Sequence, residues 1–175
     1  LSLSDIPLHV RYATLVAEDR GFYTHQGLRL RSMLRALMVN LIKLDPTSQG
    51  GSTITQQFVK NAILTTEKTY TRKLKELLLA YRIEKNFTKD QILELYFNEI
   101  PYGSTAYGVE AAAENYFGKK ARELTIGEGA ILSALPKAPT YYSPYGSHKD
   151  ELFLRQQYIL KSMVREGYLT KEEGE

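Results

Sequence analysis

Apolar residues recur every three or four positions along almost the whole chain. This period belongs to an amphipathic helix, whereas a half-buried strand alternates apolar and polar residues. Strand signals are weak throughout, and the stretch 141–145 contains Pro144 and is expected to be a loop. The sequence therefore predicts an all-α fold. The expected helices lie at 5–19, 30–41, 52–63, 74–81, 88–98, 111–117, 125–136 and 153–165.

Capping residues mark several of these helix boundaries. Thr88 with Gln91, and Thr125 with Glu128, have the spacing of a capping box, in which side chains and backbone N–H groups satisfy each other. Ser52 is expected to cap the helix that follows Gly51, because its hydroxyl can accept a hydrogen bond from a free N–H of the first turn.

Composition limits the class of protein. The 175 residues are 43% hydrophobic and 25% charged, which suits one domain with a sizeable core. The absence of cysteine excludes disulfides and thiol chemistry, and a net charge of +3 is too small to indicate a nucleic-acid partner. No apolar stretch reaches the length of about 18 residues that a transmembrane helix needs. Because the chain starts at Leu1 rather than Met, we expect residues 1–175 to be a single domain of a longer protein.

Two adjacent carboxylates, Glu18 and Asp19, stand where the first helix is expected to end. The negative end of the helix dipole disfavours an anion there by about 0.3–1 kcal/mol. A disfavoured anion has a raised pKa, which suits a general base, so Glu18 is the first catalytic candidate. The alternative is an exposed acidic helix end paired with Arg20. His25, close to aromatic residues, is more typical of a structural hydrogen bond.

A polar run from Ser52 to Gln57 opens a later helix. Helix N-termini carry free N–H groups and a partial positive charge, which together attract anions. Capping by Ser52 alone explains one of these polar residues but not the whole run. The run is therefore a candidate wall of an anion site.

Cationic residues are dense between positions 60 and 89. They are Lys60, Lys68, Arg72, Lys73, Lys75, Arg82, Lys85 and Lys89. Arg72 and Glu76 are four positions apart and share one face of a helix. This pattern indicates a diphosphate-binding surface with an embedded carboxylate, or else an ordinary solvated face with i,i+4 ion pairs. With Glu18 as base and these cations stabilising a departing diphosphate, the residues suit inverting sugar transfer from a diphosphate donor.

Five short motifs follow one another along the chain. They are Glu18-Asp19-x-x-Phe22-x-x-His25-x-Gly27, Gly51-Ser52-Thr53-Ile54-Thr55-Gln56-Gln57, Arg72-Lys73-x-x-Glu76, Ile92-Leu93-Glu94-x-Tyr96-x-Asn98, and Tyr107-Gly108-x-x-x-Ala112 leading to Tyr116-Phe117-Gly118-Lys119. In this order they resemble the glycosyltransferase domain of class A penicillin-binding proteins and monofunctional peptidoglycan glycosyltransferases, family 51. The resemblance covers nearly the whole chain.

The resemblance implies a lysozyme-like, two-lobed α fold with a membrane-facing lobe. The apolar stretch 28–44 falls where that lobe lies and suits an interfacial helix, the alternative being a core face. It also implies polymerisation of lipid II into glycan strands, with release of undecaprenyl diphosphate. The expected location is the extracytoplasmic face of the bacterial cytoplasmic membrane, in a membrane-anchored parent chain where a transpeptidase domain can follow.

The resemblance also assigns roles to individual residues. Glu18 matches the general base that activates the acceptor 4-hydroxyl, and Glu76 matches a second essential glutamate near the donor. Asp19 matches a neighbour that orders the site. The residues that match the lining of the donor diphosphate site are Ser52, Gln56, Lys60, Lys68, Arg72 and Lys75, with Arg35 as a further basic contact. A divalent cation, Mg²⁺ or Mn²⁺, is plausible at the diphosphate near Glu18 and Asp19, while Glu94, Tyr96 and Asn98 are expected to support the site from behind.

Two other functions compete with this interpretation. The first is a lytic transglycosylase or muramidase that cuts finished glycan, which would not need the cations around Arg72 because its leaving group is a sugar hydroxyl. The second is a non-catalytic module that binds lipid II, for which intact Glu18 and Glu76 would have no chemical use.

Overall fold

The computed structural model of the chain describes residues 1–27, 52–63, 70–103 and 105–175, apart from the side chain of Tyr70. Two of the predicted site residues, Arg35 and Lys68, lie outside the described residues. The apolar stretch 28–44 and the helix expected at 30–41 lie outside them as well.

Every helix or strand assigned within the described residues is helical, so the all-α prediction is confirmed. The α-helices are α1 (Leu8–Glu18), α3 (Ile54–Ala62), α4 (Tyr70–Asn86), α5 (Lys89–Glu99), α6 (Val109–Phe117), α7 (Ile126–Ala134) and α8 (Lys149–Arg165). Short 3-10 turns lie at Leu3–Asp5, Ala121–Glu123, Leu135–Lys137 and Glu172–Gly174. The β pairing in this part of the chain is one isolated bridge between Pro101 and Tyr107. None of the described helices combines the length and the apolar character needed to cross a bilayer.

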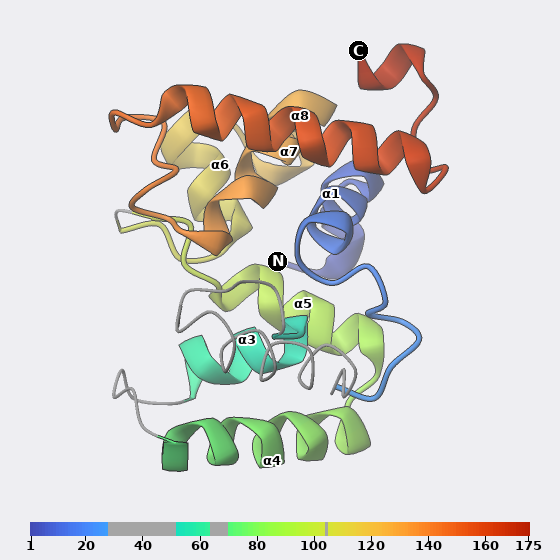
Figure 1. The fold of residues 1–175 in the computed structure, drawn as a ribbon, viewed down its shortest axis with the longest axis vertical. Helices are drawn as coiled ribbons and strands as arrows, with labels where there is room; N and C mark the ends of the chain where they lie inside the picture. The colour runs from blue at the N-terminus through green and yellow to red at the C-terminus, as the bar shows by residue number, and fades with distance from the viewer. Residues whose placement is uncertain (28–51, 64–69, 104) are drawn as a thin grey trace, which may run out of the picture.

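The described helices form two groups (Figure 1). In one group, α7 packs against both α1 and α8, with α6 beside it. In the other, α3 packs against both α4 and α5. Helix α5 contacts α6 and the first turn of the chain, and it buries Ile92, Leu93, Tyr96 and Phe97. The end of α1 and the start of α3 therefore meet where the two groups adjoin. Likeness to lysozyme and a membrane-facing lobe remain predictions.

The predicted capping boxes at Thr88 and Thr125 are confirmed, because each side chain accepts a hydrogen bond from the N–H three residues later. The predicted cap at Ser52 is wrong by one residue. Thr53 caps α3 and accepts from the N–H of Gln56. The reason is that only Thr53 places a glutamine at the third helical position, and the Gln56 side chain reaches back to the Thr53 N–H at 3.2 Å.

Several other helix bounds differ from those that the apolar periodicity predicts. Helix α4 (Tyr70–Asn86) extends beyond the expected 74–81 at both ends. The first helix begins at Leu8 instead of near Asp5, because Leu3–Asp5 forms a separate 3-10 turn. Helix α8 begins at Lys149, four positions before Phe153, and its first turn carries Asp150 and Glu151. These acidic residues suit the positive end of the helix dipole, but an apolar pattern does not detect a polar first turn.

Candidate active site

Glu18 ends α1 and its carboxylate is held from both helix groups. Arg155 of α8 donates from Nη2 to Oε1 at 3.1 Å. Gln57 of α3 donates from Nε2 to Oε2 at 2.9 Å. The Glu18 side chain is only 9% exposed. The alternative of an exposed acidic end paired with Arg20 is therefore wrong, since Arg20 instead pairs with Glu166 at 3.8 Å.

The surroundings of Glu18 make it a stronger base than a carboxylate in water. Burial raises the pKa of Glu18, and the hydrogen bond from Gln57 and the charges of Arg155 and Lys137 oppose that rise without cancelling it. The raised pKa expected from the helix end is thus confirmed in direction. Its leading cause is burial, because removal from water penalises the charged form more than a partial helix charge does.

Asp19 lies next to Glu18 but is buried and faces the protein. Its carboxylate accepts from His25 Nε2 at 2.8 Å and from the Ile54 N–H, at the start of α3, at 3.2 Å. The Nδ1 atom of His25 accepts from the Gly27 N–H at 3.0 Å, so the proton of a neutral ring is on Nε2. Asp19 therefore ties the loop after α1 to the start of α3, which supports the ordering role expected for it. His25 is part of the same structural network.

Glu76 of α4 is buried, with 1% of its surface exposed. It forms ion pairs with Lys73 and with Arg72 Nη1, the latter at 3.4 Å. Lys73 also donates to the Ser52 hydroxyl at 3.4 Å. The solvated-face alternative is therefore wrong at Glu76. The resemblance does not place Lys73 among the donor-site residues, although Lys73 belongs to the predicted cationic surface and its i,i+3 spacing to Glu76 signals this contact.

The remaining described donor-site residues, Gln56, Lys60 and Lys75, form no hydrogen bond or ion pair with Glu76. Lys60 and Lys75 are exposed and form no ion pair with any described residue. Gln56 is 1% exposed, and its side chain accepts from the Thr53 N–H inside the capping box. Its Nε2 atom is buried without a hydrogen-bond partner among the described residues. A direct substrate contact by these three residues stays a prediction.

A comparison with protein-family models matches residues 1–164 to the family described as "Transglycosylase". The chain belongs to the transglycosylase family. It is therefore a glycosyltransferase enzyme domain, and the family suggested by the ordered motifs is confirmed.

Three relatives of this transglycosylase carry the name penicillin-binding protein 1A. The chain is 49% identical to penicillin-binding protein 1A of Aquifex aeolicus over 175 residues, which are 100% of this chain and 24% of that protein. It is 46% identical to penicillin-binding protein 1A of Neisseria gonorrhoeae over 171 residues, 98% of this chain and 21% of that protein. The crystal structure of penicillin-binding protein 1A from Haemophilus influenzae matches 69% of this chain and 15% of that chain, with 34% identity and a TM-score of 0.45. The transglycosylase chain thus spans about a quarter or less of its relatives' length.

Arg155 is a residue of the candidate site that the sequence did not reveal. Its Nε donates to the Ala134 carbonyl at 3.1 Å, and its guanidinium lies over the ring of Tyr142, 5.6 Å from the centroid. The Ala134 carbonyl, at the end of α7, therefore helps to orient the Arg155 guanidinium toward Glu18. Lys137, in the turn after α7, adds a second cation near Glu18, and burial together with Arg155 lowers the pKa of Lys137. No local spacing connects α8 to the end of α1.

Both carboxylates of the first motif are held by donors of the protein. The oxygens of Glu18 and Asp19 already accept from N–H donors, one of which is a cationic guanidinium. No group of three or more His, Cys, Asp or Glu side chains within the described residues could bind a metal. A divalent cation in this transglycosylase stays a prediction, and the diphosphate of a substrate would be its main ligand.

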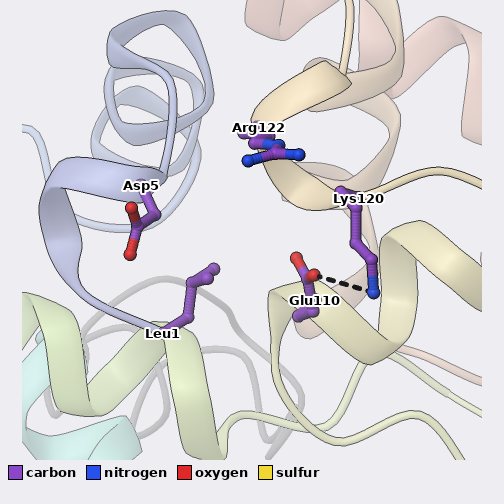
Figure 2. A pocket seen from close by; sticks show the side chains of 5 residues that line it. All are labelled: Leu1, Asp5, Glu110, Lys120 and Arg122. Atoms are coloured by element: carbon purple, nitrogen blue, oxygen red, sulfur yellow. Dashed lines mark ion pairs between the residues drawn. The ribbon is translucent and has the colours of Figure 1, made fainter.

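A pocket of about 260 Å³ lies elsewhere, beside the first turn of the chain (Figure 2). It is lined by Leu1, Asp5, Glu110, Lys120 and Arg122. Figure 2 shows the side chains of Lys120 and Glu110 paired with each other, at 3.6 Å. None of the predicted site residues lines this pocket.

Proposed function

We propose that the chain is a peptidoglycan glycosyltransferase that polymerises lipid II into glycan strands by inverting transfer. Membership of the transglycosylase family and the shared name of its relatives support this class of reaction. The observation that carries the mechanism is the contrast between two carboxylates. Glu18 has a raised pKa through burial, whereas Glu76 is enclosed by the cations Lys73 and Arg72.

Glu18 is the general base of the proposed reaction. It takes the proton of the acceptor's 4-hydroxyl while that oxygen attacks the anomeric carbon of the donor. The new C–O bond forms as the bond from that carbon to the diphosphate oxygen breaks, and one displacement inverts the carbon. Each oxygen of Glu18 accepts one hydrogen bond from the protein, which leaves lone pairs for the proton.

The leaving group is undecaprenyl diphosphate, and its developing charge needs cations. Lys73 and Arg72 are held by Glu76, and Lys73 also reaches Ser52 just before α3. At the other end of the link, Gln57 of α3 contacts Glu18. The start of α3 therefore connects the surroundings of Glu76 with those of Glu18. Fixed charges of this kind stabilise a transition state without reorganising during the reaction. We assign Gln56, Lys60 and Lys75, and the predicted Arg35 and Lys68, to the same diphosphate.

The proposed setting is the extracytoplasmic face of the bacterial cytoplasmic membrane. Lipid II and the growing glycan are the partners, and a Mg²⁺ or Mn²⁺ ion carried by the diphosphate would add Lewis-acid stabilisation. A transpeptidase domain in a larger parent chain is part of the same proposal, since the named relatives are about four times as long or more.

Incubation with lipid II, detergent and a divalent cation tests the function, with products separated by size. Glu18→Gln removes the base. Glu99→Gln is the matched control, because Glu99 also ends a helix, α5, but is exposed. Long glycan from the wild type and Glu99→Gln, but not from Glu18→Gln, is expected. Cleavage of preformed glycan without polymer would favour the lytic enzyme, and lipid II binding without either activity would favour the binding module.

A further inference from the structure

The Gln57 side chain connects the catalytic carboxylate to a tyrosine behind it. Its Nε2 donates to Glu18 Oε2 at 2.9 Å. Its Oε1 accepts from the hydroxyl of Tyr96 at 3.4 Å. These contacts join α5, α3 and the end of α1 in one line of hydrogen bonds. Both the nitrogen and the oxygen of the Gln57 amide therefore form a hydrogen bond.

Tyr96 can act as a permanent donor in this line. It is 0% exposed. Burial raises the pKa of Tyr96 well above its usual range, and the charge of Glu18 raises it further. The hydroxyl therefore keeps its proton at neutral pH. A phenol that stays protonated offers its O–H to the amide oxygen.

An amide can turn over and exchange its oxygen and nitrogen, so its orientation needs a cause. With Oε1 toward Glu18, two oxygens would face each other and the ionised carboxylate would lose a donor. The Tyr96 hydroxyl favours the opposite orientation, because it donates a hydrogen bond to Oε1 and so holds that oxygen on the side away from Glu18. We propose that Tyr96 is a positioning residue that holds the Gln57 amide with its N–H toward Glu18. This role rests on the proposed function of Glu18 as base, and it goes beyond the architectural role expected for Tyr96.

Several charged or titratable groups act on Glu18 besides this line. They are Arg155 of α8, Lys137 after α7, Asp19 next in the chain, and the buried Tyr96 and Tyr102. Tyr102 offers a matched control, since it is 1% exposed and is influenced by the charge of Glu18, but it forms no hydrogen bond with the Gln57 side chain, whose partners are Tyr96 and Glu18. Replacing it with Phe removes a buried hydroxyl without touching the amide.

The direct test is ¹³C NMR titration of the Glu18 carboxyl, assigned with Glu18→Gln, in the wild type, Tyr96→Phe, Gln57→Met and Tyr102→Phe. This titration does not depend on catalysis, so it stays informative if polymerisation fails. The pKa of Glu18 should rise in Tyr96→Phe and rise further in Gln57→Met, because each variant weakens the donor to the charged form. Tyr102→Phe should give a smaller change than Tyr96→Phe.

Kinetic measurements then distinguish a positioning role of Tyr96 from an effect of its replacement on folding. On the acid limb of the pH profile, kcat/KM should fall about threefold in Tyr96→Phe and about tenfold in Gln57→Met, with recovery at higher pH. In a Gln57→Met background, Tyr96→Phe should add nothing, because Tyr96 acts through the amide. A pH-independent loss in Tyr96→Phe, equal effects of Tyr96→Phe and Tyr102→Phe, or full additivity with Gln57→Met would each overturn the proposal.

Discussion

Arg155 Nη2 lies 3.1 Å from Glu18 Oε1, although the two residues are 137 positions apart in the chain. The Arg155 side chain is 11% exposed and that of Glu18 is 9% exposed, so the ion pair is shielded from water. The guanidinium is also held by the Ala134 carbonyl and lies over Tyr142. Packing of α8 on α1 and α7 therefore decides where the candidate base points.

Removing Arg155 should destabilise the fold and alter the base. Arg155→Met leaves a buried Glu18 without its ionic partner, which should lower the free energy of unfolding by about 3 kcal/mol at neutral pH. Urea unfolding at pH 7 measures this change. Arg155→Lys keeps the charge but not the fixed fork of donors, so its loss should be smaller. Equal stability of Arg155→Met and the wild type would show that the ion pair contributes nothing.

The pH dependence of stability should carry the signature of Glu18. Its folded pKa lies above the ordinary value of 4.5. Between those two values the folded chain holds a proton that the unfolded chain has released, so stability falls as pH rises through this window and is constant above it. Relative to Glu18→Gln, the wild type should therefore lose stability as pH rises from about 4.5.

Glu128 provides the opposite case for the same measurement. Burial is the largest single influence and raises its pKa, but the hydrogen bonds from Lys119 and Thr125 and the charge of Lys119 together outweigh burial and lower the pKa overall. Relative to Glu128→Gln, the wild type should lose stability as pH falls through the folded pKa of Glu128. Chemical unfolding of all three proteins between pH 3 and 8 gives both slopes, and slopes of the same sign would contradict the assignment.

Glu76 should matter for the rate of transfer more than for substrate binding. Glu76→Gln removes the charge that holds Lys73 and Arg72, and a displacement of these cations by about 1 Å could lower kcat about 100-fold. The measurement is the initial rate of glycan formation at saturating lipid II. Glu99→Gln, on an exposed carboxylate, should keep the wild-type rate. A Glu76→Gln variant with wild-type kcat would exclude Glu76 from the donor site.

The corrected helix cap predicts unequal effects of two neighbouring substitutions. Thr53→Ala should lower the free energy of unfolding by about 1–2 kcal/mol, because the Thr53 hydroxyl accepts from the Gln56 N–H and also donates to the Gly27 carbonyl at 2.7 Å. Ser52→Ala should cost less stability, since Ser52 does not cap α3. Thermal unfolding of both variants checks the order, and a larger loss for Ser52→Ala would restore the original prediction.

The sequence by itself determined the features that depend on neighbours within a turn or two of helix. The all-α fold, the capping boxes at Thr88 and Thr125, and the Arg72–Glu76 pair follow from spacings of three and four residues. Motif order was enough to indicate the family, because it needs no geometry. This local information did not identify the cap of α3 correctly, since it favoured Ser52 over the neighbouring Thr53.

Only the tertiary structure decided the environment of the candidate base. Burial of Glu18 between the two helix groups, and not the end of α1, is the leading cause of its raised pKa. The contacts of Glu18 with Arg155 and Gln57 join residues 137 and 39 positions apart. Such contacts arise when helices pack, and packing depends on the shape of whole surfaces, which no short spacing in the sequence encodes.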